Sequence, residues 1–293
     1  MAPIFSVVTT AKNEKNLDKT FDNWDYTRQL FEDHIKRRNA VEFIFVDAGG
    51  NNGLVERAEG YGFKIVYEDE YEEYRGTLYE TGETKYKKWN TPSMGRNLGF
   101  KYAEGKIDIF QDSDTYFSTG TVIDYQYINS AVDSYKNYLE VMYDAFRKKN
   151  IVAAAPSMRP SDSKSLHRRF GIKGQNFMTF STCKLPTIEF LGNPVIGASA
   201  PGPSFVVLND VVSRIDGPYN PRLAIGEDYL FSRNVGKFGR VSYEKKACAF
   251  IRTFNRVKND RLEFIRSLLL ALKWSPHYVF PGFVEYKRHD LSA

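Results

Sequence analysis

The sequence of 293 residues is poor in the patterns that mark disulfide, thiol or zinc chemistry. It contains two cysteines, Cys183 and Cys248, which lie far apart and form neither a CxxC motif nor a zinc-binding spacing. Its four histidines are scattered, without an HExxH motif or a close pair. The cysteines are therefore interpreted as core residues of a protein from a reducing compartment.

Long apolar runs are also missing. The chain has no stretch of about 18 uncharged apolar residues, so it predicts no transmembrane helix. Residues 1–4 lead directly into a strand-like run, without the pattern of a signal peptide. Together these absences predict a cytoplasmic protein.

Charge of one sign is only in slight excess. The chain has 41 Lys and Arg residues against 36 Asp and Glu residues, which gives a net charge of +5. No basic run carries interleaved aromatic residues, so nucleic acid is not an expected partner. The mild positive charge suits an anionic small molecule or an anionic membrane surface.

The hydrophobic pattern that is present predicts a doubly wound α/β fold with a mostly parallel sheet. Strand-like runs over residues 4–10, 41–46 and 63–67 alternate with helical patterns, and the run over 41–46 is apolar enough to be buried on both faces. This strand–helix alternation is typical of a parallel sheet with helices on its faces.

Further elements are expected along the rest of the chain. Residues 68–95 are interpreted as a surface loop or a lid, and residues 157–200 as an irregular active-site wall or surface insertion. The regular elements expected here are a helix opening at 93, a strand over 107–110, a helix over 131–149, a strand over 151–155 and a final helix over 262–274.

The strongest chemical signal is Asp112-Ser113-Asp114, which directly follows an apolar strand. Ligands of open α/β sheets bind at the carboxyl ends of the strands. Two carboxylates there can hold a hard divalent cation, because Mg²⁺ typically takes one or two carboxylates and completes its shell with water and phosphate oxygens. The motif therefore predicts a site for Mn²⁺ or Mg²⁺ that would stabilise charge on a diphosphate.

Two further acidic segments carry alternative interpretations. Asp47 ends a strand and precedes two glycines, so it could accept hydrogen bonds from a nucleobase or ribose, or it could form an Asx-type turn. Glu227 and Asp228 open a helical pattern, where either carboxylate could cap the helix or act as a general base.

Five elements, in order, resemble those of family 2 glycosyltransferases and cover about residues 4–240. They are Ile4–Glu14, similar to the first strand and loop; Val46–Gly50, a variant of VDDGS; Gly95–Gly99, similar to ARNxG; Phe110–Asp114, similar to xxDSD; and Gly217-Pro218-Tyr219 with Gly226-Glu227-Asp228, similar to GGF…ED.

The resemblance implies a GT-A fold and the metal-dependent transfer of a hexosyl or pentosyl group from a nucleotide-diphosphate sugar to an acceptor hydroxyl. It implies catalytic roles for Asp228, the base of an inverting displacement, and its neighbour Glu227. The donor-side and metal residues that it implies are Thr9 and Glu14 beside the nucleotide, Asp47 at the base, Arg96 at the donor or its phosphates, Asp112 at the ribose and metal, and Asp114 as main metal ligand. Arg96 could alternatively form a structural ion pair.

The resemblance also divides the chain. Residues 1–250 would form the catalytic domain, with a nucleotide-sugar half over 1–115 and an acceptor half over 116–250, and 251–293 a helical extension. The acceptor could be a glycan, a lipid-linked molecule or a small molecule. The final helix either packs on this domain or touches a membrane surface.

Two departures from the family pattern affect the site. Ala48 replaces the second acid of VDDGS, and Arg252 stands near the place where many relatives have a metal-binding histidine. Arg252 could neutralise the diphosphate directly.

The alternatives are a retaining enzyme of the same fold and a binding protein that has lost catalysis. A nucleotidyltransferase is disfavoured, because the amino-terminal region has no glycine-rich phosphate loop with a lysine.

Overall fold

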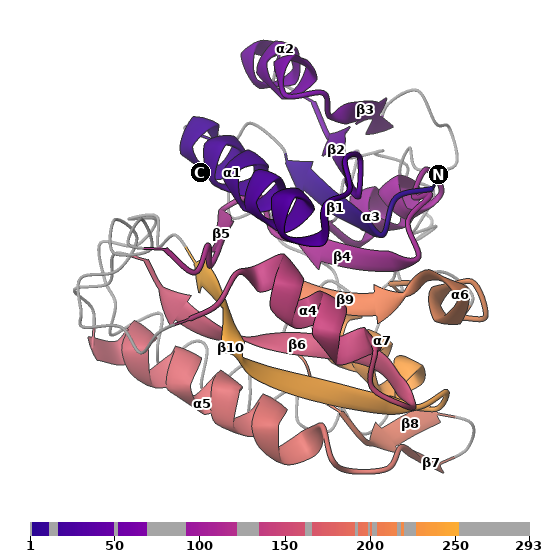
Figure 1. Ribbon diagram of the computed structural model, residues 1–293. Coiled ribbons are helices and arrows are strands. Elements are labelled where there is room, and N and C mark those ends of the chain that lie inside the picture. The colour runs from indigo at the N-terminus through magenta and orange to yellow at the C-terminus, as the bar shows by residue number, and fades with distance from the viewer. Residues whose placement is uncertain are drawn as a thin grey trace, which may run out of the picture.

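The described part of the computed structural model comprises residues 2–11, 17–49, 52–68, 92–121, 135–161, 166–190, 193–198, 200, 204–215, 218–219 and 227–251. An eight-stranded sheet runs through it, with helices on both faces (Figure 1). Glu14, Arg252, residues 262–274, which were predicted to form a helix, and most of the 68–95 segment lie outside the described residues.

The amino-terminal half is a parallel α/β unit in which strands alternate with helices. Its sheet order is β3-β2-β1-β4, and every neighbouring pair is parallel. Parallel neighbours need a crossover connection, which helices provide here. The elements are β1 (Phe5–Ala11), α1 (Asp18–Ile35), β2 (Val41–Asp47), α2 (Asn52–Gly60), β3 (Lys64–Tyr67), α3 (Pro92–Phe100) and β4 (Ile107–Gln111).

The carboxyl-terminal half extends the same sheet in the order β4-β9-β6-β10-β5. β9 runs antiparallel to both β4 and β6, and β5 runs antiparallel to β10, so the other six strands share one direction. The elements are β5 (Thr115–Phe117), α4 (Tyr138–Phe146), β6 (Ile151–Pro160), α5 (Leu166–Thr182), β7 (Ile188–Phe190), β8 (Asn193–Ile196), β9 (Ser204–Leu208), α6 (Asn209–Val212), α7 (Glu227–Val235) and β10 (Arg240–Ile251). The mostly parallel sheet predicted from the sequence is confirmed.

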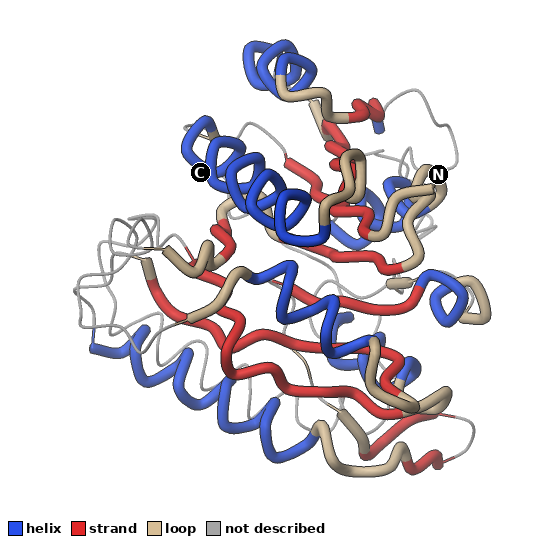
Figure 2. Tube along the Cα trace, in the orientation of Figure 1, coloured by secondary structure: helices blue, strands red, loops and turns tan. Residues whose placement is uncertain are grey.

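Two apolar clusters sandwich the sheet. One packs α1, α2 and α4 on one face, with Phe21 and Trp24 fully buried at its centre. The other packs α3, α6 and α7 on the opposite face and includes Leu98 and Phe231. Burial of whole helix faces on both sides accounts for the α/β layering, since each apolar side chain removed from water contributes about 1.5–3 kcal/mol. Figure 2 shows the helices of both layers beside the strands.

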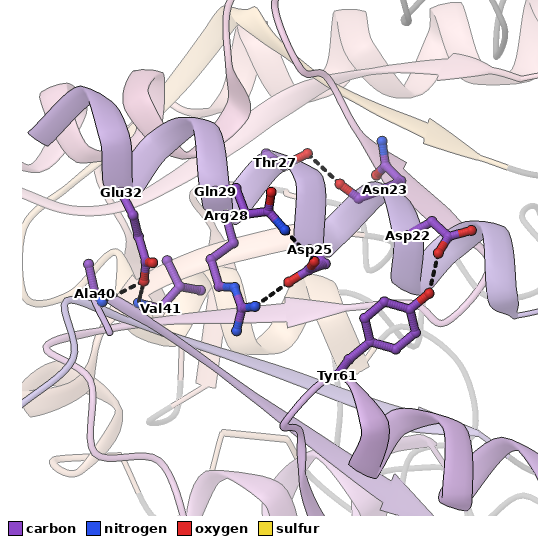
Figure 3. Close-up of polar contacts among 10 residues, drawn as sticks. All are labelled: Asp22, Asn23, Asp25, Thr27, Arg28, Gln29, Glu32, Ala40, Val41 and Tyr61. Atoms are coloured by element: carbon purple, nitrogen blue, oxygen red, sulfur yellow. Dashed lines mark hydrogen bonds and ion pairs between the residues drawn. The ribbon is translucent and has the colours of Figure 1, made fainter. Parts of the chain in front are cut away.

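Helix α1 is tied to its neighbours by polar contacts as well as by its apolar face (Figure 3). Glu32 is buried and accepts a hydrogen bond from the Ala40 backbone N–H, at 2.7 Å, just before β2 begins. Asp22 accepts one from the Tyr61 hydroxyl. This hydrogen bond and burial raise the pKa of Tyr61 to about 12. The contacts fix α1 relative to β2 and α2.

Of two sequence-based expectations about the second half, one was confirmed with shorter bounds and the other was wrong. The helix expected over 131–149 is α4, which begins only at Tyr138, because the Asn137 side chain caps it by accepting from two backbone N–H groups. The segment 157–200 is largely regular, and it contains the 17-residue helix α5 and the two short strands β7 and β8.

Candidate functional site

The carboxyl ends of β1, β2 and β4 meet at one edge of the sheet. β1 and β2 run in register there, with Ala11 opposite Asp47, and β4 ends at Gln111, immediately before Asp112. The strand-end location predicted for Asp47 and Asp112 is therefore confirmed. Ligands of open parallel sheets bind at such an edge.

Asp47 makes the local contact of an Asx-type turn. Its Oδ1 accepts a hydrogen bond from the Gly49 backbone N–H at 3.1 Å. Gly49 has φ +103°, in the region that side chains avoid, so glycine suits this position. The turn holds the Asp47 carboxylate at the end of β2.

Thr9 is buried within β1. The residue is 1% exposed and lies opposite Phe45 of β2. Among the described residues, its hydroxyl has no hydrogen-bond partner.

Helix α3 sits unusually close to β1 because of two glycines. A Cβ at Gly95 would lie 2.3 Å from the Thr10 hydroxyl oxygen, and one at Gly99 would lie 2.4 Å from a Val8 methyl carbon. Both distances are far below van der Waals contact. The GxxxG spacing puts both glycines on the face of α3 that touches the strand. Close packing therefore brings Arg96 to the sheet edge.

Arg96 joins two of the acidic segments. Its guanidinium contacts the carboxylate of Asp112 and lies 3.3 Å from that of Asp228. The Arg96 side chain is 4% exposed, whereas those of Asp112 and Asp228 are 34% and 22% exposed. The structure thus brings together residues from three separate motifs, the closest of them 16 positions apart.

A tyrosine covers the same guanidinium. The Arg96 Cζ lies 5.0 Å from the centre of the Tyr219 ring, within the range of a cation–π contact. The Asn97 amide binds the Tyr219 backbone twice, donating to its carbonyl at 2.7 Å and accepting from its N–H at 2.9 Å. Tyr219 also packs against Phe110 and Phe231. Sequence reasoning gave Asn97 and Tyr219 no role, although both stand within recognised motifs.

The Asp112–Asp114 segment forms the short connection between β4 and β5. The Thr115 backbone N–H donates to the Asp112 carbonyl at 3.1 Å, and the Thr115 hydroxyl donates to the Asp114 carboxylate at 3.5 Å. The Thr115 carbonyl in turn accepts a hydrogen bond from the Trp24 indole at 2.9 Å. Helix α1 therefore anchors the end of the acidic turn.

The donor set of this turn fits a hard divalent cation. Asp112 and Asp114 offer carboxylate oxygens, and one or two carboxylates suffice for Mg²⁺ when phosphate and water complete the shell. No group of three or more acidic, histidine or cysteine side chains that could hold a metal occurs within the described ranges. Of the described residues, Asp112 and Asp114 would hold a metal here, together with oxygens of its ligand.

Sequence reasoning overlooked Arg159. It is exposed near the carboxyl end of β6, opposite Phe250 of β10, which in turn pairs with Tyr116 of β5. The Arg159 Nε donates a hydrogen bond to the Tyr135 hydroxyl at 2.9 Å. Arg159 is the first charged residue after the buried run that begins at Ile151, and this change of residue type is the signal that could have marked it.

Glu227 begins α7. Helix α5, which includes Arg168 and Arg169 near its start, packs against β6. Across the portion of the chain described above, no helix has both the length and the apolar character to cross a membrane.

No protein-family model matches the chain, and no curated protein matches its sequence. Solved structures do resemble it. Residues 1–349 of S. aureus TarS, solved with UDP-GlcNAc, align at a TM-score of 0.51 and 17% identity, over 94% of this chain and 69% of the solved TarS chain. Glucosyl-3-phosphoglycerate synthase of M. tuberculosis, solved with Mn²⁺, UDP and phosphoglyceric acid, aligns at 0.50 and 12%, over 95% and 78%. Both are glycosyltransferases, and the chain shares their GT-A fold.

Proposed function

We propose that this protein is a metal-dependent glycosyltransferase that moves a sugar from a nucleotide-diphosphate sugar to an acceptor hydroxyl. The observation that carries the proposal is the joining of Asp112 and Asp228 through Arg96 at the ligand-binding edge of a GT-A sheet. The resemblance to a UDP-GlcNAc complex and to a complex with Mn²⁺ and UDP supports a UDP-linked donor as the first candidate.

The donor would lie over the ends of β1, β2 and β4. Asp47 would contact the nucleoside, Asp112 the ribose and metal, and Asp114 the metal. A bound Mn²⁺ or Mg²⁺ would stabilise the negative charge of the departing diphosphate. Thr9 would support this site from beneath, because its side chain is buried.

Asp228 would act from the acceptor side. Its carboxylate would take the proton of the acceptor hydroxyl while that oxygen attacks the anomeric carbon. The bond from the anomeric carbon to the diphosphate oxygen breaks in the same step, so the sugar is transferred with inversion. Under this proposal residues 1–115 form the donor half and 116–250 the acceptor half. The contact of Arg96 with Asp228 crosses between them.

Replacing the base tests this assignment. Asp228→Asn should lower kcat about 10²–10⁴-fold, which is the usual contribution of a general base. The donor Kd should stay within about 3-fold of the wild-type value. A panel of nucleotide sugars with metal would first identify the donor by thermal shift. Asp144→Asn, an exposed carboxylate on α4, is the matched control. Full activity in Asp228→Asn would remove the base from the proposal.

The metal ligand is tested by binding. Asp114→Ala should abolish the gain in donor affinity that Mn²⁺ provides, because it removes one of the two carboxylates of the Asp112–Asp114 turn. Calorimetry of donor binding with and without Mn²⁺ measures this. Asp33→Ala, on the exposed surface of α1, should keep the full metal effect. An unchanged metal effect in Asp114→Ala would place the metal elsewhere.

The stereochemistry of the product separates the inverting enzyme from a retaining one. NMR of the product anomer should show the configuration opposite to that of the donor. Retention would leave Asp228 to orient the acceptor rather than deprotonate it. Tight donor binding with no transfer or hydrolysis would instead favour a binding protein that has lost catalysis.

A further inference from the structure

Arg96 was expected to support the donor or its phosphates, or to form a structural ion pair, and its surroundings favour a role based on the ion pairs. Its side chain is almost fully buried, and its guanidinium faces two carboxylates and the Tyr219 ring. We propose that Arg96 is a positioning residue that fixes Asp228 relative to Asp112. This inference rests on the proposed function, because it concerns how the base is placed relative to the donor.

The chemistry of arginine suits this role. The guanidinium is planar and always charged, and it presents several N–H donors in a rigid fork, so one side chain can bind two carboxylates in a fixed relation. Asp112 follows β4, and Asp228 is the second residue of α7. Arg96 therefore links a strand end on the donor side to a helix start on the acceptor side.

Arg96 is itself held from several directions. Gly95 and Gly99 bring α3 against β1, which fixes the backbone on both sides of Arg96. The Tyr219 ring covers its guanidinium, and the Asn97 amide fixes the Tyr219 backbone. Such a link would hold the base in place, and a misplacement of about 1 Å can cost about 10²-fold in rate.

If Arg96 positions the base, replacing it should lower turnover and leave donor binding nearly unchanged. Arg96→Gln should lower kcat about 30- to 100-fold and leave the donor Kd within about 3-fold. Arg96→Lys should recover part of the loss, because an ammonium keeps the charge but lacks the fork that spans both carboxylates. Arg214→Gln, an exposed arginine paired with Asp210 on α6, should match the wild type.

The experiment combines steady-state kinetics with calorimetric donor binding in the presence of Mn²⁺, and thermal unfolding establishes that each variant is folded. If Arg96→Gln does not fold, the same two quantities are measured for Arg96→Lys. Its kcat should fall and its donor Kd should stay unchanged. A donor Kd raised 10-fold or more with kcat kept would make Arg96 a phosphate ligand and overturn the inference. An unchanged kcat in a folded variant would overturn it as well.

The failure of this inference is distinguishable from that of the proposed function. If the wild type transfers no sugar from any donor, the proposed function fails. If the wild type is active, Asp228→Asn is inactive and Arg96→Gln keeps its full kcat, only the positioning role fails.

Discussion

Asp108 is an acidic residue of β4 that lies in the protein interior, away from solvent. It lies on β4, four positions before Asp112, yet it is fully buried and accepts a hydrogen bond from the Asn209 side chain at 3.4 Å. Burial, reinforced by the nearby Glu42, raises the pKa of Asp108 well above its usual value, although the Asn209 hydrogen bond opposes this. The folded protein therefore favours the protonated acid.

This shift predicts a pH-dependent stability difference. Because the pKa of Asp108 is raised on folding, the folded state binds the proton more tightly, and stability is lost as the pH rises from the unfolded pKa to the folded one. Asp108→Asn mimics the protonated acid and should be more stable than the wild type near neutral pH. The difference should vanish below about pH 4, the ordinary range of an aspartate.

Urea unfolding at a series of pH values measures this difference. Asp210→Asn, on the exposed surface of α6, should show no such trend. A gap between Asp108→Asn and the wild type that is constant with pH would contradict the assignment.

Residue types at strand ends could be predicted from the sequence, but their partners could not. The placement of Asp47 and Asp112 followed from the apolar runs before them. The contact between Arg96 and Asp228 joins residues 132 positions apart, and it depends on how α3 and α7 pack. A one-dimensional pattern contains no such information, and for the same reason it did not show that Thr9 is buried.

At the scale of elements, the approach of α3 to β1 leaves no room for a side chain at Gly95. Gly95→Ala should destabilise the protein by about 1–3 kcal/mol, because the added methyl would overlap the Thr10 side chain. Gly174→Ala in α5 is the matched control. Its Cβ would meet nothing within 4 Å, so the higher helix propensity of alanine should add about 0.5–1 kcal/mol.

Chemical denaturation measures the free energy of unfolding of both variants. Their transferase activity shows whether Arg96 keeps its position. A Gly95→Ala protein with wild-type stability would mean that α3 can move away from β1 at little cost.

Helix α5 was not predicted, because its sequence lacks a clear helical spacing of apolar residues. Its described residues bury only a narrow stripe, in which Thr179 and the following Cys183 stand one turn apart, while Phe177 is 70% exposed. Neither buried residue is a strong apolar signal, and Gly174 lowers helix propensity. The Asn176 amide fixes the helix by pairing with both backbone groups of Met158. A tertiary contact, invisible in sequence, therefore supports this helix.

At the scale of the whole molecule, Asn23 of α1 joins the two halves. Its amide donates to the Phe117 carbonyl at 3.0 Å and accepts from the Phe117 N–H at 2.7 Å, 94 positions away. Asn23→Ala should cost about 1–3 kcal/mol, because it leaves buried backbone groups of β5 without these bonds.

The same substitution should weaken metal-dependent donor binding, because β5 follows the Asp112–Asp114 turn directly. Gln29→Ala, which removes only an exposed hydrogen bond of α1, should change stability by less than about 0.5 kcal/mol. Calorimetry and denaturant unfolding of both variants decide whether Asn23 has this role.

The hydrogen bonds from Asn23 and Trp24 have a consequence for the behaviour of the protein in a crowded solution. β5 is the last strand at its end of the sheet. The Asn23 and Trp24 side chains form hydrogen bonds with its outward-facing groups, which are the carbonyls of Thr115 and Phe117 and the Phe117 N–H. Unpaired groups on an edge strand are a template for association with another chain. Here a helix of the same chain takes their place, so this end of the sheet resists edge-to-edge aggregation while remaining next to the acidic turn.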